Sequence, residues 1–271
     1  MSCLTQIFTE KWKRFVLRHR LWLAPARSHA VVLSLFFVLF GIWYLITLDG
    51  FIDPVFLPSP GRTFSSLANL LSSNFLFEHV LPSSGRVAVG FALSILVAFP
   101  LGVLTGQIPS VARVVHPLCG MARYLPVAAL VPLSILWFGI HDGQKVAVII
   151  IGVVFQLVLL IASDTASVPK ELVETALTFG LSRRQILSRI VIPWSMPAIW
   201  DDLRISAGWA WSYVVLAELV AGNRGVGYFI VQSQRFLETD RAFAGIIVIA
   251  MLGFITDLAF RLSATRLFRW S

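Results

Sequence analysis

Charged side chains are scarce in this sequence. Asp, Glu, Lys and Arg together make up 13% of the 271 residues, against about 25% in an ordinary soluble domain. Hydrophobic residues make up 57%, and the mean hydropathy is +0.82. This composition excludes an ordinary water-soluble fold and is typical of an integral membrane protein.

The sequence lacks the residue patterns of metal sites, disulfide frameworks, common hydrolases and ATP-binding loops. The two cysteines, Cys3 and Cys119, are far apart and offer neither a metal-type spacing nor a disulfide framework. The sequence has no His-Glu-x-x-His pair and no Gly-x-Ser-x-Gly motif. An intramembrane protease or acyltransferase is therefore disfavoured, and we expect no catalytic residue, no metal site and no cofactor in this chain. It also lacks a Gly-x4-Gly-Lys-Ser/Thr loop, so any ATP hydrolysis must belong to a partner.

Six apolar runs are long enough to cross a membrane, which takes about 20 residues, or somewhat fewer when flanking charges snorkel. They are residues 30–48, 87–107, 124–140, 146–163, 205–222 and 242–260. The first run is too long for a signal peptide and is not followed by a small-residue cleavage site, so we expect it to be retained. We predict an all-α polytopic membrane protein with an N-terminal segment 1–29, a six-helix domain 30–263 and a tail 264–271.

The net charge of +8 is explained by topology rather than by binding of nucleic acid, for which we expect no role. Basic residues flank the runs in four segments: before the first, between the second and third, between the fourth and fifth, and after the sixth. In chain order they are Lys11, Lys13, Arg14, Arg18, Arg20, Arg27, Arg113, Arg183, Arg184, Arg189, Arg261, Arg266 and Arg269. Six spans place all four segments on one side, which the positive-inside rule makes cytoplasmic. Both termini are therefore expected in the cytoplasm.

The segment 164–203, between the fourth and fifth runs, has the pattern of two short helices joined by a glycine. Pro169 and the acidic residues after it favour the start of a first helix, which Gly180 ends. The spacing of 182–185 is that of a capping box and predicts a second helix, which Pro193 ends. We expect an elbow that is apolar toward the membrane and charged toward the cytosol. A connector lying on lipid headgroups has the same amphipathic pattern.

The spacing inside this elbow resembles the EAA cytoplasmic loop of binding-protein-dependent ABC transporter permeases. The loop residues in this sequence are Glu174, Thr175, Ala176, Gly180, Arg183, Ile190 and Pro193. Thr175 replaces the usual first Ala, and Ile192 replaces the usual Leu. In this family the loop docks into a separate ATPase subunit, so the resemblance favours a coupling elbow over a lipid-bound connector.

Nearly the whole chain is similar to the taurine, sulfonate, nitrate and bicarbonate branch of these permeases, through residues 57–60, 125–140, 217–219 with 225–228, and 236–240. The resemblance implies a homodimer in the bacterial cytoplasmic (inner) membrane. It also implies two ATP-binding subunits, which carry ATP and Mg, and an extracytoplasmic solute-binding protein. The implied substrate is a small anion, with an alkanesulfonate such as taurine favoured over nitrate, bicarbonate or a heterocycle precursor. A channel or secondary transporter is disfavoured because we find no internal repeat.

The candidate pathway or gate residues lie in the fifth run: Trp209, Trp211, Ser212, Tyr213 and Glu218. Carboxylates inside a span are functional hypotheses by default. We expect Asp257 to pair with Arg261 one turn on, whereas Glu218 is equally consistent with a gate and with a helix-packing hydrogen bond. The six runs contain no Arg or Lys, so we expect no buried basic residue there. An anion would then meet Trp, Tyr and Ser side chains or helix N-termini.

Two further segments have a distinctive local pattern. The run 124–140 contains Pro126 and Pro132, which we expect to kink a spanning helix. In the outer loops, residues 63–71 predict a surface helix. Residues 225–236 are too short to span, and the sequence leaves open whether they dip into the membrane or lie on its surface against the binding protein.

Overall fold

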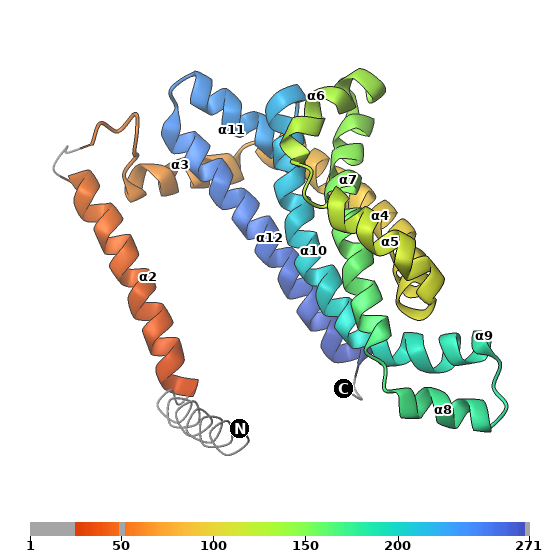
Figure 1. Ribbon diagram of the computed structural model, residues 1–271. Helices are drawn as coiled ribbons and strands as arrows, with labels where there is room; N and C mark the ends of the chain where they lie inside the picture. The colour runs from red at the N-terminus through yellow and green to blue at the C-terminus, as the bar shows by residue number, and fades with distance from the viewer. Residues whose placement is uncertain (1–24, 49–51, 269–271) are drawn as a thin grey trace, which may run out of the picture. The chain divides into compact units, whose positions relative to one another are not determined.

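The computed structural model describes residues 25–48 and 52–268, and these residues form helices and short connections without a β-strand (Figure 1). The all-α prediction is confirmed for this part of the chain. Two compact units divide the chain, 1–62 and 63–271. Some residues used in the sequence analysis lie outside the described part: Cys3, Lys11, Lys13, Arg14, Arg18, Arg20 and Arg269.

Unit 1 contains one long helix, α2 (Pro25–Leu48), where the sequence predicts the first span. Its middle part exposes Leu35, Phe36 and Phe37, as expected for a helix that faces lipid. The apolar part of this helix, Leu33–Leu48, is shorter than a full membrane span. After α2 the chain turns, and Trp43 Nε1 donates to Pro58 O at 3.1 Å.

Three helices of unit 2 are long and apolar enough to cross a membrane. They are the π-helical turn η1 (Leu76–Val80) continued by α4 (Leu81–Gln107), α7 (Asp142–Ala166) and α12 (Thr239–Leu267). α4 and α7 pack very closely, because a Cβ added at Gly102 would lie 2.7 Å from Ile161 Cβ. Small residues allow such close contact between membrane helices. These helices confirm the runs predicted at 87–107, 146–163 and 242–260.

The sequence predicts one kinked helix at 124–140, and this prediction is wrong. The structure has α5 (Pro109–Ala122) and α6 (Val127–Phe138), which meet at an angle of 96°. Because proline has no N–H and disfavours helical geometry in the residue before it, the chain leaves the helix before Pro126. Pro126 itself is extended and precedes the first turn of α6. With 12 residues, α6 is about 18 Å long and does not cross a membrane alone.

The run at 205–222 forms the second half of α10 (Ile192–Ala221). Length and composition identify three spanning helices in the described residues, or four if α5 and α6 form one span, so the count of six is not confirmed. The prediction that Pro193 ends the preceding helix is wrong. α9 (Arg183–Ile186) continues through the π-helical turn η2 (Leu187–Val191) into α10. A π turn changes the hydrogen-bond register where proline lacks a donor.

Three shorter helices complete unit 2. α3 (Pro60–Ser72) confirms the helix predicted at 63–71, and α11 (Val226–Arg235) lies within the outer segment 225–236. α8 (Lys170–Thr178) precedes α9. Figure 1 shows α6 and α11 at one end of unit 2 and α8 and α9 at the opposite end. Cys119 is a free, buried thiol in the main core.

Candidate functional site

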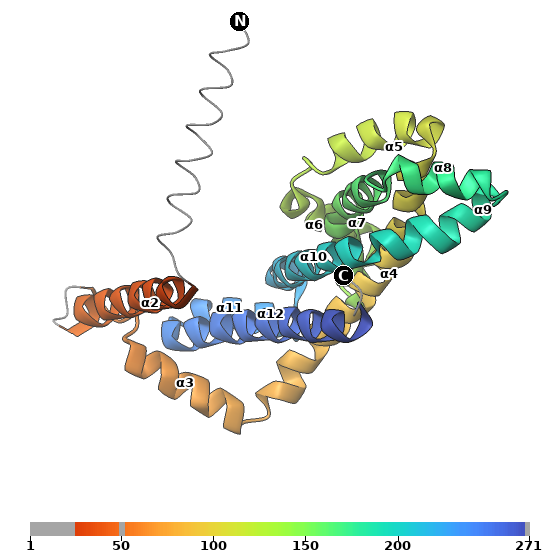
Figure 2. The same cartoon turned by 90° about the horizontal axis from the view of Figure 1, so that it is seen from below.

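The first candidate site is the elbow formed by α8 and α9, which lie side by side and project from unit 2 (Figures 1 and 2). Gly180 has φ +77°, a left-handed conformation that favours glycine. Gly180 N donates to Leu177 O at 2.9 Å, and Leu181 N donates to Ala176 O at 3.1 Å. This pair of bonds is a Schellman motif, which satisfies the last carbonyls of α8.

Gly180 is needed for its backbone conformation and not for close packing of two helices. A Cβ added at Gly180 would meet no heavy atom within 4 Å, so this glycine does not allow two helices to approach each other. Its contribution is the reversal of the chain direction. The capping box predicted at 182–185 is confirmed: Ser182 Oγ accepts from Gln185 N, and Gln185 Oε1 accepts from Ser182 N at 2.8 Å.

The elbow has a small apolar core of its own. Its buried members are Val168, Ala176, Ile186 and Val191. Ile190 packs against this core and is half-buried. The two short helices therefore pack against each other and form one structural unit.

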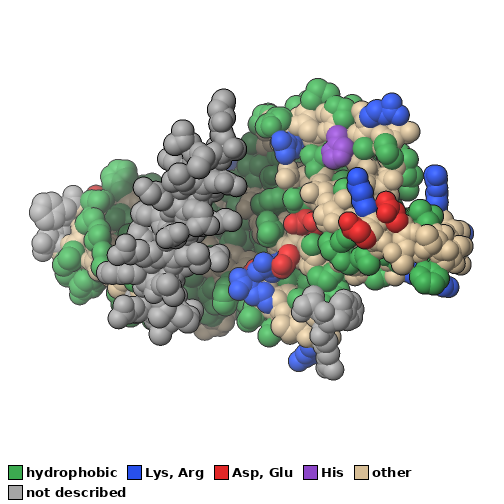
Figure 3. Space-filling view, turned by 60° about the horizontal axis from the view of Figure 1, so that its bottom comes forward, with side chains coloured by type: hydrophobic (Ala, Val, Ile, Leu, Met, Phe, Trp, Pro, Cys, Tyr) green, Lys and Arg blue, Asp and Glu red, His purple; other side chains and the backbone are tan. Residues whose placement is uncertain are grey.

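The outward face of the elbow combines charge with exposed apolar surface. Glu174, Thr175 and Arg183 are exposed, and Phe179 at the tip is 80% exposed. Figure 3, in which the bottom of the view in Figure 1 comes forward, shows acidic and basic side chains on this end of unit 2. A large exposed aromatic residue beside charges is typical of a surface that contacts another protein.

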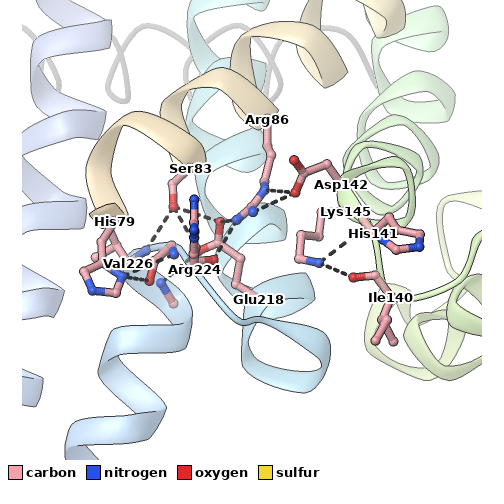
Figure 4. Close-up of polar contacts among 12 residues, drawn as sticks. His79, Ser83, Arg86, Ile140, His141, Asp142, Lys145, Glu218, Arg224 and Val226 are labelled. Atoms are coloured by element: carbon pink, nitrogen blue, oxygen red, sulfur yellow. Dashed lines mark hydrogen bonds and ion pairs between the residues drawn. The ribbon is translucent and has the colours of Figure 1, made fainter. Parts of the chain in front are cut away.

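At the opposite end, Glu218 is fully buried in a polar cluster that joins α4, α10 and α11 (Figure 4). Its carboxylate accepts from Ser83 Oγ at 2.8 and 2.9 Å, from Arg86 Nη1 at 2.7 Å and from Gly227 N at 2.9 Å. The carboxylate therefore caps the first turn of α11, where a negative charge is favoured. These contacts favour the helix-packing interpretation of Glu218 over the gate.

A glycine makes this cap possible. Gly225 precedes α11 with φ +120°, and a Cβ added there would lie 2.4 Å from the carboxylate of Glu218. Val226 N donates to Ser83 Oγ at 3.0 Å. The family pattern at 217–219 and 225–228 therefore has a structural explanation. A buried acid on α10 requires a glycine turn that leaves room for its carboxylate.

The structure buries two basic residues that sequence reasoning missed. Arg86 is 6% exposed and donates to Asp142 Oδ1 at 2.7 and 2.8 Å, in addition to its bond to Glu218. Lys145 is 1% exposed and donates to Ile140 O at 3.1 Å. Each lies one residue outside a predicted run but inside the spanning helix that the structure has there, Leu76–Gln107 or Asp142–Ala166. The expectation of spans without a buried basic residue is therefore wrong. The available signal was the carboxylate inside the fifth run, since a buried charge needs a partner.

The second candidate site is an open cavity of about 280 Å³ in unit 2, and two of the residues around it, Arg123 and Leu125, are exposed. The residues around it come from the end of α5, the connection to α6, the first residue of α6, the middle of α7 and α10. They are Ala122, Arg123, Leu125, Val127, Ile151, Gly152, Phe155, Gln156, Trp209 and Tyr213. The cavity thus brings together two of the predicted pathway residues, Trp209 and Tyr213. It also includes Arg123, a cation that is not among the predicted pathway residues.

The remaining predicted pathway residues lie elsewhere. Trp211 is buried in the core, and its Nε1 donates to Thr256 Oγ1 at 3.0 Å. Ser212 is exposed and donates to Gly208 O at 3.4 Å. Asp257 accepts from Arg261 Nε at 2.6 Å, which confirms the predicted pair. Among the described residues, no group of three or more His, Cys, Asp or Glu side chains is arranged to hold a metal ion.

Residues 94–269 match the family described as binding-protein-dependent transport system inner membrane component. The chain is 31% identical to the taurine transport system permease protein of Escherichia coli over 238 residues, covering 86% of each chain. It is 33% identical to a putative aliphatic sulfonates transport permease protein of Bacillus subtilis over 233 residues, covering 86% of this chain and 84% of that protein.

A solved structure shares the fold at lower sequence identity. A chain of the MetNI methionine ABC transporter, in an inward facing conformation, superposes with a TM-score of 0.62 at 17% identity. The match covers 69% of this chain and 94% of that one. The similarity therefore includes the fold of the helices as well as the sequence.

Proposed function

The chain belongs to the family of binding-protein-dependent inner membrane transport components, and we propose that it is the permease subunit of an ATP-driven importer of small sulfonates. The observation that carries the proposal is the match over residues 94–269, which include both the elbow and the cavity. The family and the apolar helices make it an inner-membrane protein.

The proposed topology has six passes: α2, α4, the bent pair of α5 and α6, α7, α10 and α12. α8 and α9 lie on the cytoplasmic side, and α11 lies on the outer side. Two features support this arrangement. The basic residues Arg183, Arg184 and Arg189 are in the elbow, and the elbow and α11 lie at opposite ends of unit 2 (Figure 1). An even number of passes leaves both termini in the cytoplasm.

The proposed assembly is a homodimer with two cytoplasmic ATP-binding subunits, which bind ATP and Mg, and an extracytoplasmic solute-binding protein. Each elbow contacts an ATP-binding subunit through the exposed Glu174, Thr175 and Arg183, with Phe179 as the apolar anchor. Aromatic residues in an otherwise charged surface are common centres of protein interfaces.

The elbow is built to transmit a displacement. Its core makes the two short helices move together, and α9 runs through η2 into α10 without a loop. α10 carries Trp209 and Tyr213 at the cavity. Closure of the ATP-binding pair would therefore act on the cavity through one continuous helical rod, which is the kind of rigid element that carries coupling between distant sites.

The proposed substrate is an alkanesulfonate such as taurine, because two relatives are named for taurine and aliphatic sulfonates. Nitrate, bicarbonate and a heterocycle precursor are the alternatives. Weak binding inside the permease is sufficient when a separate binding protein supplies affinity.

Reconstitution tests this function. The permease, its ATP-binding subunit and its binding protein are placed in proteoliposomes, and uptake of labelled taurine is measured with and without ATP. We expect uptake that requires ATP and the binding protein. Uptake driven by an ion gradient alone would identify a secondary transporter and contradict the proposal. Calorimetric titration of the binding protein with sulfonates, nitrate and bicarbonate then decides the substrate class.

The coupling part has its own test. Glu174→Lys should reduce co-purification of the ATP-binding subunit and stimulated ATP hydrolysis, because it reverses a charge on the contact face. Glu78→Lys, which reverses the charge of an exposed acid in η1, outside the elbow, is the matched control. Equal stimulated hydrolysis in the two variants would contradict the role of the elbow.

A further inference from the structure

We infer that the cavity between α5, α6, α7 and α10 binds the sulfonate group of the substrate during its passage, with Arg123 as the cation that recognises it. This inference rests on the proposed function and assigns its substrate site. The volume of about 280 Å³ lies just below the range for drug-sized ligands, about 300–1,000 Å³. It suits a molecule of a few heavy atoms.

The charge of the cavity favours an anion. Arg123 is its charged lining residue, and no Asp or Glu is among the lining residues that the structure describes. Within the described part of the chain, the guanidinium pairs with no carboxylate. It donates to Tyr124 Oη at 3.0 Å and lies 5.0 Å from the centre of that ring. Tyr124 thus holds the guanidinium without neutralising it, so its charge is available to a ligand.

The position of α6 adds to this charge. Val127, the first residue of α6, lines the cavity, and the first turn of a helix presents unpaired N–H groups and a partial positive charge. The bend of 96° before α6 brings this N-terminus and Arg123 to the same cavity. An anion there would meet two positive groups, as at many phosphate and sulfate sites.

Three polar side chains at the cavity are left without a hydrogen bond in the described residues. They are Gln156, Trp209 and Tyr213. Nε1 of Trp200 and of Trp211, in contrast, each donates within the protein. All three cavity residues are half-buried, so their polar groups are available to a polar ligand in the cavity.

Apolar lining residues fit the rest of such a molecule. Leu125, Ile151 and Phe155 provide apolar surface at the cavity. Tyr213 is seated against Gly152, where an added Cβ would lie 2.5 Å from its ring. This fixed ring gives the cavity a rigid wall. An alkanesulfonate, with a compact anionic head and a short carbon chain, has the same division between polar and apolar parts.

The test compares two arginines of the complete transporter in proteoliposomes. Arg123→Gln should lower taurine uptake about tenfold or more, the usual effect of losing a hydrogen bond to a charged group, while binding-protein-stimulated ATP hydrolysis persists. Arg113→Gln removes an exposed cation from α5 outside the cavity and should change neither measurement. Arg123→Lys should recover part of the uptake, because it restores the charge.

Two results would overturn the inference. Equal uptake in Arg123→Gln and Arg113→Gln would show that the cation is not used. An effect of Arg123→Gln that appears with phosphatidylglycerol but not in pure phosphatidylcholine vesicles would assign the cavity to a lipid phosphate. If the unaltered transporter takes up no solute with ATP, the proposed function fails instead.

A second pair of variants tests the unpaired donors without changing charge. Tyr213→Phe and Trp209→Phe keep a ring and remove one donor each. We expect a raised KM for uptake with kcat largely retained, because the binding contact is lost and the helix packing is not. Trp200→Phe, whose indole N–H donates to Phe260 O away from the cavity, is the control. An unchanged KM in both cavity variants would contradict the assignment.

Discussion

The two ends of unit 2 use glycine and polar caps in opposite ways. In the elbow, the capping box and the buried members of its small core all lie within residues 168–191. At the other end, the cap of α11 is a carboxylate from α10, and its partners Ser83 and Arg86 are 135 and 132 residues away in sequence. The comparison shows that one physical requirement, a satisfied helix terminus, is met locally in one region and by tertiary contacts in the other.

The capping residues at the two ends also differ in how deeply they are buried. Glu218 is fully buried and Arg86 is nearly so, whereas Ser182 and Gln185 of the capping box are exposed. Water replaces a lost hydrogen bond at the elbow but not at the outer end. Equivalent substitutions should therefore cost more at the outer end.

The largest expected effect comes from breaking the buried cluster. Glu218→Ala leaves Arg86 and Ser83 without their carboxylate and should lower the free energy of unfolding by about 3–5 kcal/mol. The measurement is denaturation of the purified permease in detergent. Glu218→Gln keeps the shape and should cost less. If Glu218→Ala unfolds like the unaltered protein, the cluster is not a structural centre.

The next largest effect is expected at Gly225. Gly225→Ala places a Cβ 2.4 Å from the carboxylate of Glu218 and forces a side chain into a conformation that is almost confined to glycine. We expect a loss of about 2–4 kcal/mol in the same assay. Gly61→Ala, where an added Cβ meets nothing within 4 Å, is the control. A loss no larger than that of the control would show that α11 adjusts around the new methyl group.

Gly180 separates the two effects that act together at Gly225. A side chain at Gly180 strains the left-handed backbone but would meet no neighbouring atom within 4 Å. Gly180→Ala should cost about 1–2 kcal/mol, the penalty for a left-handed residue with a Cβ. Gly180→Asn should cost less, since asparagine tolerates this conformation. Unfolding of the elbow is followed by protease cleavage between α8 and α9. Equal cleavage of Gly180→Ala and Gly180→Asn would argue against a conformational role.

The smallest expected effect is at the capping box. Ser182→Ala removes the side-chain acceptor of Gln185 N and should destabilise the elbow by about 1 kcal/mol. Ser188→Ala is the matched control, because Ser188 is exposed and its hydroxyl donates to the carbonyl Gln185 O instead of accepting from an N–H in the first turn of α9. The same proteolysis assay ranks the two variants. Faster cleavage of Ser188→Ala than of Ser182→Ala would contradict the assigned cap.

The sequence predicts the elbow well because its determinants are neighbours in the chain. Gly180 and the box at 182–185 occur where the structure has a Schellman motif and a cap. The prediction fails at Pro193, where η2 lets the helix continue. It also fails at 124–140, because composition indicates an apolar helix but not how far the chain bends before Pro126.

The cavity and the buried cluster were only partly accessible to sequence reasoning. Trp209 and Tyr213 were selected from the fifth run, but Trp211 and Ser212, selected with them, point to other surroundings. Arg123 and Arg86 were overlooked because each lies just outside an apolar run. Helical periodicity alone did not reveal which side of α10 faces α7 and which faces α12.

Hydropathy, local caps and fixed spacings are properties of neighbouring residues, so they indicate the membrane class, the helical fold, the elbow and the family without a structure. Three outcomes appear only in the folded chain: Glu218 caps α11, Arg86 and Lys145 are buried, and Arg123 shares a cavity with Trp209 and Tyr213. These outcomes depend on how helices pack. A residue's partners across a helix interface are set by the rotation and depth of both helices, which one-dimensional spacing does not encode.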